Sequence, residues 1–77
     1  MKSDQGVTLR AHGEIGEALK GRRRAQGVTQ AMLSDYAGVS RVSLTKIERG
    51  GDLRLSTLLK LTGLLGLEVV IRPRDAR

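Results

Sequence analysis

Apolar residues recur every three or four positions in four consecutive segments of the chain, a spacing that is typical of amphipathic helices. The four segments are residues 14–26, 30–37, 41–49 and 55–65. Glycine, which tolerates the left-handed backbone common at helix ends, follows each of them. These glycines are Gly27, Gly38, Gly50 and Gly66. The pattern therefore predicts four short helices.

Capping residues support these helices, and a change of period follows the last of them. Thr29 and Ser40 directly precede the second and third segments and suit the N-cap position. Ser56 is the expected cap of the fourth helix, and the first is capped by Thr8 or by a residue near His12. After Gly66 the residues become β-branched and partly alternate until Pro73, which predicts one short strand.

Leucines dominate the fourth segment and divide into two groups. Leu58, Leu59 and Leu65 lie on a continuous helical stripe and are expected in the core. Leu61 and Leu64 lie partly off that stripe. An apolar remainder on so small a domain indicates a dimer surface.

The predicted strand has no second strand in its own chain with which to pair. An isolated strand would leave a row of backbone donors and acceptors unpaired. We therefore expect it to pair with the same strand of a second copy about a two-fold axis. The expected dimer interface consists of Leu61, Leu64, Leu65, Val69, Val70 and Ile71.

Composition excludes several classes of function. The 77 residues form one domain, and the absence of cysteine with a single histidine argues against disulfides and metal sites. We expect no catalytic residues, no cofactor and no enzymatic activity, because no pair of nucleophile and base and no glycine-rich phosphate loop is found. The apolar runs are too short for a membrane span, and a cytoplasmic, nucleoid-associated location is expected.

The charge points to a nucleic-acid partner. The net charge is +6, and between Lys20 and Gly50 seven basic residues stand against two acidic ones. Tyr36 is the single aromatic residue, so the chain has no stacking platform for single strands. Double-stranded DNA is the expected partner.

Two short helices joined by Gly38-Val39-Ser40 have the layout of a helix-turn-helix that enters the major groove. If Leu44 and Ile47 face inward, the third helix presents a polar and basic face to solvent. Arginine and lysine can donate to guanine, valine can contact a thymine methyl, and hydroxyl groups can reach phosphates or base edges. This face consists of Arg41, Val42, Ser43, Thr45, Lys46 and Arg49.

The joint motif resembles the Xre type of helix-turn-helix, also found in Cro and phage repressors, over about residues 14–66. It runs Thr29-Gln30-Ala31-x-Leu33, then Gly38-Val39-Ser40-Arg41, then Leu44-x-x-Ile47-Glu48-Arg49-Gly50. The stretch from Leu55 to Glu68 is similar to HipB-type antitoxins within that family.

This resemblance implies a mainly α fold, a four-helix helix-turn-helix domain of lambda-repressor-like type followed by one C-terminal β-strand that pairs across a dimer. The expected division of the chain is a flexible N-terminal arm (1–13), the DNA-binding domain (14–66), the dimerisation strand (67–73) and a tail (74–77).

The resemblance also implies roles for individual residues. Arg41, Val42 and Lys46 would face bases, and Arg23 would form an ion pair with Glu48 that holds the fold together. Phosphate contacts are expected from Gln30, Ser40 and Ser43, and the flanking positions of Thr45 and Arg49 give these two the same role.

The expected function is a sequence-specific transcriptional repressor that binds a palindromic operator as a homodimer. Within that class, the narrower resemblance favours the autoregulating antitoxin of a toxin-antitoxin pair, with a cognate toxin as a further partner. Two alternatives stay open. One is a phage-type or stand-alone regulator with no toxin, and the other is a protein-interaction module that keeps the fold without reading DNA.

Overall fold

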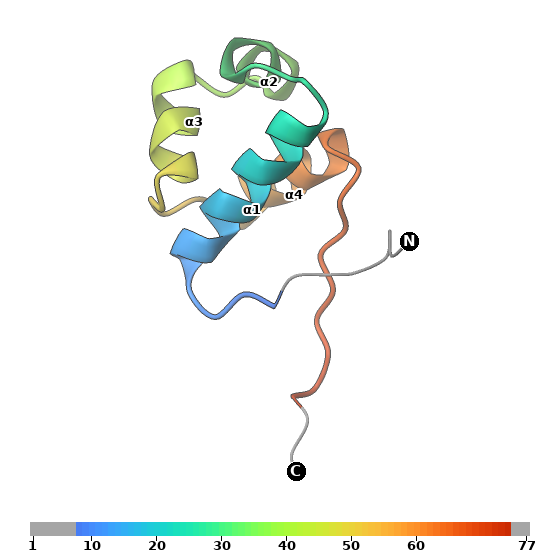
Figure 1. Cartoon of the computed structure of the whole chain (residues 1–77). Helices are drawn as coiled ribbons and strands as arrows, with labels where there is room; N and C mark the ends of the chain where they lie inside the picture. The colour runs from blue at the N-terminus through green and yellow to red at the C-terminus, as the bar shows by residue number, and fades with distance from the viewer. Residues whose placement is uncertain (1–7, 75–77) are drawn as a thin grey trace.

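Four helices follow one another along the chain in the computed structural model, which describes residues 8–74 (Figure 1). They are α1 (His12–Ala25), α2 (Gln30–Ala37), α3 (Arg41–Glu48) and α4 (Leu55–Leu64). All four predicted helices are present. None of the helices in this range is long and apolar enough to cross a membrane.

The start of α1 is stabilised from inside the helix. The N-cap is Ala11. Of the two caps expected from the sequence, Thr8 and a residue near His12, the second is therefore the one present. The Glu14 carboxylate accepts hydrogen bonds from the backbone N–H groups of Arg10 and Ala11, and its negative charge suits the helix N-terminus. Residues 12–13, expected in the arm, therefore belong to α1. Residues 1–7 of that arm lie outside the described part.

The connection between α2 and α3 has the expected caps. The hydroxyl of Thr29 accepts a hydrogen bond from the backbone N–H of Met32 at 3.1 Å, and Ser40 does the same for Ser43 at 3.0 Å. Gly38 has a φ of 67°, which a residue with a side chain would adopt only with strain. The turn predicted from the sequence is therefore confirmed in its caps and its glycine.

The core lies where the four helices meet. Leu44 and Ile47 are buried on the inward face of α3, as predicted. The buried apolar residues are Leu19, Leu33, Ala37, Leu44, Ile47, Leu61 and Leu65. Val28, Val39 and Leu53, from the connections between helices, pack against this cluster.

The backbone of α3 approaches α1 closely at Gly16. A Cβ atom at this buried position would stand 2.2 Å from the carbonyl oxygen of Ile47. Such a distance is far below van der Waals contact, so only glycine fits without a shift of one helix. Glycine has a low helix propensity, and at Gly16 the structure shows the reason for its presence within α1, which is the contact with α3.

The rotation of α4 about its axis differs from the sequence expectation. Leu61 is fully buried in the core, and Leu59 is 51% exposed. The expectations that Leu61 lies on the surface and that Leu59 lies in the core are therefore wrong. Leucines occur around most of α4, so the sequence pattern alone did not determine which of them the other helices cover. Leu65 is 1% exposed and Leu64 is 46% exposed.

The helix α4 also starts without the expected cap. Its N-cap is Arg54, whose side chain makes no capping hydrogen bond, and Ser56 lies inside the helix. The carboxylate of Asp52 instead accepts the backbone N–H of Leu53 at 3.0 Å, in the loop that precedes α4.

The C-terminal segment leaves the helical body after Gly66, whose φ is 70°. The N–H of Leu67 still bonds the carbonyl of Thr62 at 2.8 Å, and beyond it residues 68–74 run as an exposed single segment (Figure 1). No strand is formed within residues 8–74 of this single chain. Because a strand needs a second edge for its backbone hydrogen bonds, the predicted pairing depends on another copy.

Candidate nucleic-acid interface

The outward face of α3 carries side chains that suit a DNA groove. Arg41, Val42, Lys46 and Arg49 are all exposed, and Val42 has 66% of its surface open to solvent. The opposite face is anchored in the core by Leu44 and Ile47. The inward residues therefore fix the helix, and the outward residues are available to a partner.

Two hollows flank α3, and each carries basic side chains. The first is lined by Arg24 of α1, by Arg41 and by the start of α2. The second lies on the other side, where Lys46 and Arg54 are accompanied by the acidic Asp52. A helix in the major groove has a phosphate backbone on either side. Positive charge on both flanks of α3 matches that arrangement, although the sequence expectations included neither Arg24 nor Arg54.

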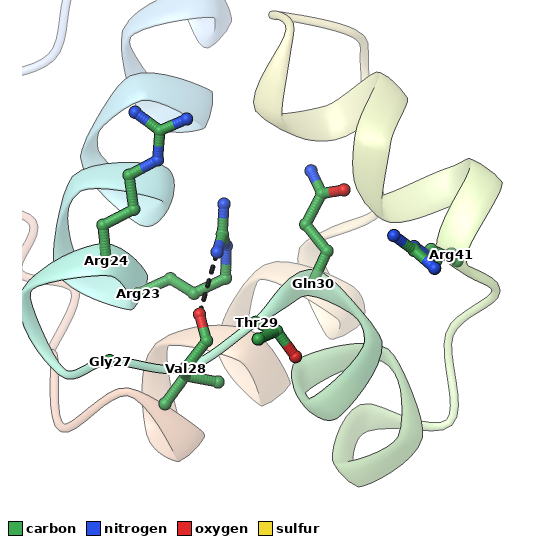
Figure 2. Close-up of a pocket in the computed structure, with 7 residues that line it drawn as sticks. All are labelled: Arg23, Arg24, Gly27, Val28, Thr29, Gln30 and Arg41. Atoms are coloured by element: carbon green, nitrogen blue, oxygen red, sulfur yellow. Dashed lines mark hydrogen bonds between the residues drawn. The ribbon is translucent and has the colours of Figure 1, made fainter.

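A buried ion pair joins α1 to the end of α3. Arg23 Nε donates to Glu48 Oε2 at 2.7 Å, and Nη2 donates to Oε1 at 3.0 Å. The remaining Nη1 donates to the carbonyl oxygen of Val28 at 2.8 Å (Figure 2). The ion pair implied by the resemblance is therefore present, in the bidentate geometry that gives arginine and carboxylate their strongest contacts.

The surroundings of Glu48 keep it charged. Burial favours the protonated form, but the hydrogen bonds from Arg23 and Gln30 outweigh it, and the pKa of Glu48 lies below its ordinary value. The hydrogen bond to Glu48 in turn raises the pKa of Arg23 above its ordinary value. Each charge therefore stabilises the other inside the fold.

Gln30 belongs to this buried network as well as to the surface. Its Nε2 donates to Glu48 Oε1 at 2.9 Å, and its Oε1 accepts the hydroxyl of Thr45 at 3.3 Å. Figure 2 shows Gln30 between Arg24 of α1 and Arg41 of α3. No local pattern predicted the bond to Glu48, because residues 18 apart in the chain meet only through the packing of α2 on α3.

The three hydroxyl groups expected at phosphates differ in how free they are. Thr45 also donates to the carbonyl oxygen of Arg41 at 2.9 Å, so its proton is used within the fold. The hydroxyls of Ser40 and Ser43 are hydrogen-bonded to each other at 2.9 Å. One proton of that pair is left for an outside acceptor. The geometry therefore favours the serine pair over Thr45 as a phosphate contact.

The arginine run of α1 splits into three separate environments. Arg22 bonds the carbonyl of Leu65, Arg23 bonds Glu48, and Arg24 lines the first hollow beside α3. Successive residues on a helix point about 100° apart, so a run of like charges need not share one role. Of the three, Arg24 lies on the candidate interface.

The profile of the helix-turn-helix family HTH_3 matches residues 19–71. The chain belongs to this helix-turn-helix family. The match includes all of α2, α3 and α4, the second half of α1 and part of the C-terminal segment, and it confirms the family indicated by the motif.

Solved structures show the same fold. The restriction-modification controller protein C.AhdI from Aeromonas hydrophila is 32% identical, with 73% of this chain and 86% of that chain covered and a TM-score of 0.69. The biofilm regulator SinR, solved in complex with DNA, is 28% identical over 70% of this chain and 89% of its own, with a TM-score of 0.66.

A chain in the HipA-HipB-O2-O3 complex is 20% identical, with a TM-score of 0.80 over 91% of this chain and 100% of that chain. At 20% identity this likeness shows only that the two chains share a fold. Among curated proteins, no sequence matches this one.

Proposed function

We propose that this protein is a DNA-binding transcriptional regulator that inserts α3 into the major groove. The observation that carries the proposal is the exposed basic face of α3 with a basic hollow on each side. The membership of the helix-turn-helix family and the likeness to SinR, a regulator solved with DNA, support it.

Arg41, Val42 and Lys46 are the proposed base contacts, because they are exposed on the outward face of α3. Arg49, the pair Ser40 and Ser43, and the first residue of α2, Gln30, are the proposed phosphate contacts. Thr45 is left out of the proposed phosphate contacts, because its hydroxyl proton is used within the fold.

Selection of bound sequences from a random duplex pool tests this proposal. Arg41→Ala should relax the preference at one operator position, at a cost of about 1–3 kcal/mol against the selected sequence. Arg49→Ala should weaken all duplexes alike and reduce the slope of log affinity against log salt by about one. If the pool yields no enriched sequence, the chain is an interaction module that does not read DNA.

The proposed regulator works as a dimer through its C-terminal segment. Val69, Val70 and Ile71 are 46%, 65% and 95% exposed in the single chain, and Leu64 is exposed on α4. The interface is revised from the sequence expectation, because Leu61 and Leu65 are already buried within one chain. Leu55 and Leu59, which are exposed on α4, are further candidates for it.

Antiparallel pairing of the two segments would satisfy their backbone groups and place two α3 helices about 34 Å apart, one turn of DNA. A chain that ends at Gly66 should then be a monomer at micromolar concentration and bind its operator more weakly. A dimer of undiminished affinity would contradict pairing through this segment.

The finer proposal is an autoregulating repressor of the antitoxin kind. It rests on the match to the full length of a chain in the HipA-HipB-O2-O3 complex, a likeness of fold. The alternative is a stand-alone regulator, which the higher identity to the controller C.AhdI favours. Co-purification of the protein product of an adjacent reading frame as a stable complex would support the antitoxin. Retention of operator binding with no such complex would support the stand-alone regulator.

A further inference from the structure

The carbonyl oxygen of Leu65 accepts two hydrogen bonds, one from a side chain of α1 and one from the C-cap residue of that helix. Arg22 Nε lies 2.8 Å from it and Gln26 Nε2 lies 3.2 Å from it. Carbonyl groups at the C-terminal end of a helix have no partner within the helix, and positive charge there also suits the helix dipole. Two polar contacts therefore tie α1 to the end of α4.

This contact lies directly before the point at which the C-terminal segment leaves the body. A Cβ atom on Gly66 would stand 3.2 Å from Arg22 Nη2, so the guanidinium lies against the turn itself. On the other side, the N–H of Leu67 is held by the carbonyl of Thr62. The direction in which the segment departs is therefore fixed by contacts on both sides of Gly66.

The same helix also holds the end of α3. Arg23, which follows Arg22, forms the ion pair with Glu48, the last residue of α3. A single rigid helix thus connects the proposed DNA-contacting helix to the base of the proposed dimerisation segment. We therefore expect the loss of the contacts to Leu65 to loosen the angle between these two elements.

We propose that Arg22 and Gln26 are positioning residues that determine which spacing of operator half-sites the dimer accepts. The inference rests on the proposed function, because it needs two α3 helices joined through their C-terminal segments. Two joined DNA-binding domains bind two half-sites with full affinity only when the distance and angle between the domains match those between the half-sites. By fixing the exit of the segment, the two side chains restrict the dimer to one spacing.

The test uses the operator selected with the full chain and a second duplex with one base pair inserted at its centre. The insertion turns one half-site by about 34° and moves it about 3.4 Å. The wild-type protein should bind the altered duplex on the order of tenfold more weakly, because both α3 helices no longer fit at once. The variant carrying Arg22→Ala and Gln26→Ala should lose most of this discrimination, to roughly threefold or less.

Arg24→Ala is the matched control, since it removes the same charge from the same helix without touching Leu65. It should weaken both duplexes by the same factor and keep the wild-type ratio. If the double variant also keeps that ratio, Arg22 acts at most as a general phosphate contact and the inference is overturned. Gln26→Ala alone, which keeps the arginine, should give an intermediate ratio and serves if the double variant melts below the assay temperature.

Failure of the proposed function has a different signature. A wild-type protein that selects no sequence, or that binds both duplexes equally, would contradict the joined dimer and with it this inference. A second outcome would contradict only the role of Arg22 and Gln26. In that outcome the wild-type protein has a strong spacing preference, and the double variant keeps this preference in full and has the same dimer mass.

Discussion

The helices α3 and α4 are both short, but only α3 has an inward face that its sequence reveals. In α3, Leu44 and Ile47 are the buried apolar residues and nearly all other positions are polar. In α4, leucines occur on both the buried and the exposed side, with Leu61 inside and Leu59 outside. The buried face of a helix with one apolar stripe can be predicted from its sequence. In a helix that is apolar around most of its circumference, the packing of neighbouring helices determines which face is buried.

The two helices are also held by different forces. Polar contacts of defined geometry fix α3, through the hydrogen bonds of Glu48 with Arg23 and with Gln30. The body of α4 is anchored by buried leucines, with a polar tie at its last carbonyl. We therefore expect that removing a charged side chain weakens the packing of α3, and that shortening a buried side chain weakens the packing of α4.

The largest effect is expected from Glu48→Ala, which should destabilise the protein by about 3–5 kcal/mol. It leaves the buried guanidinium of Arg23 without its partner, and an uncompensated buried charge is costly. Chemical denaturation measures the free energy of unfolding. The exposed Glu17→Ala, on the outer side of α1, should change it by less than about 0.5 kcal/mol. Equal losses at the two positions would contradict the role given to the ion pair.

Leu61→Ala should destabilise by about 2–5 kcal/mol, because it opens a cavity at a fully buried site. Leu59→Ala removes the same atoms from a half-exposed site and should cost well under half as much. Both unfolding free energies are measured at the same protein concentration, since a dimer gains stability with concentration. A larger loss of stability for Leu59→Ala than for Leu61→Ala would mean that Leu59 faces the core, as the sequence predicted.

Gly16→Ala should destabilise by about 1–3 kcal/mol, because its methyl group would overlap the carbonyl oxygen of Ile47 and force α1 and α3 apart. Gly21→Ala is the control in the same helix. Apart from the backbone of its own helix turn, no atom lies within 4 Å of a Cβ there, so the better helix propensity of alanine should stabilise the protein by up to about 1 kcal/mol. Thermal melts that shift in the same direction would contradict the close approach at Gly16.

The smallest expected effect is a difference in the pH dependence of stability. The folded-state pKa of Glu48 is lowered, so its contribution is complete above the unfolded pKa of about 4.3 and is lost as pH falls through the folded value. Glu48→Gln removes this contribution, so its stability should fall less steeply below about pH 4.5 than that of the wild type. Parallel curves in denaturation series at several pH values would show that the carboxylate carries no such linkage.

The sequence predicted those parts of the candidate interface that depend on residues close together in the chain. The caps Thr29 and Ser40, the turn at Gly38 and the two inward residues of α3 together determine that Arg41, Val42 and Lys46 face outward. All of these signals act within a few residues of one another in the chain. The ion pair of Arg23 with Glu48 was expected by resemblance and not from any local pattern.

The four helices, the turn between α2 and α3 and the outward face of α3 follow from the order of the amino acids alone, because period, caps and glycines act over one or two helical turns. Only the packing of the helices determines that Leu61 is buried, that Gly16 meets the backbone of α3, and that Arg22 bonds Leu65 while Arg23 bonds Glu48. These facts depend on the angles at which helices cross. Such angles are set by the fit of side chains that lie far apart in the sequence.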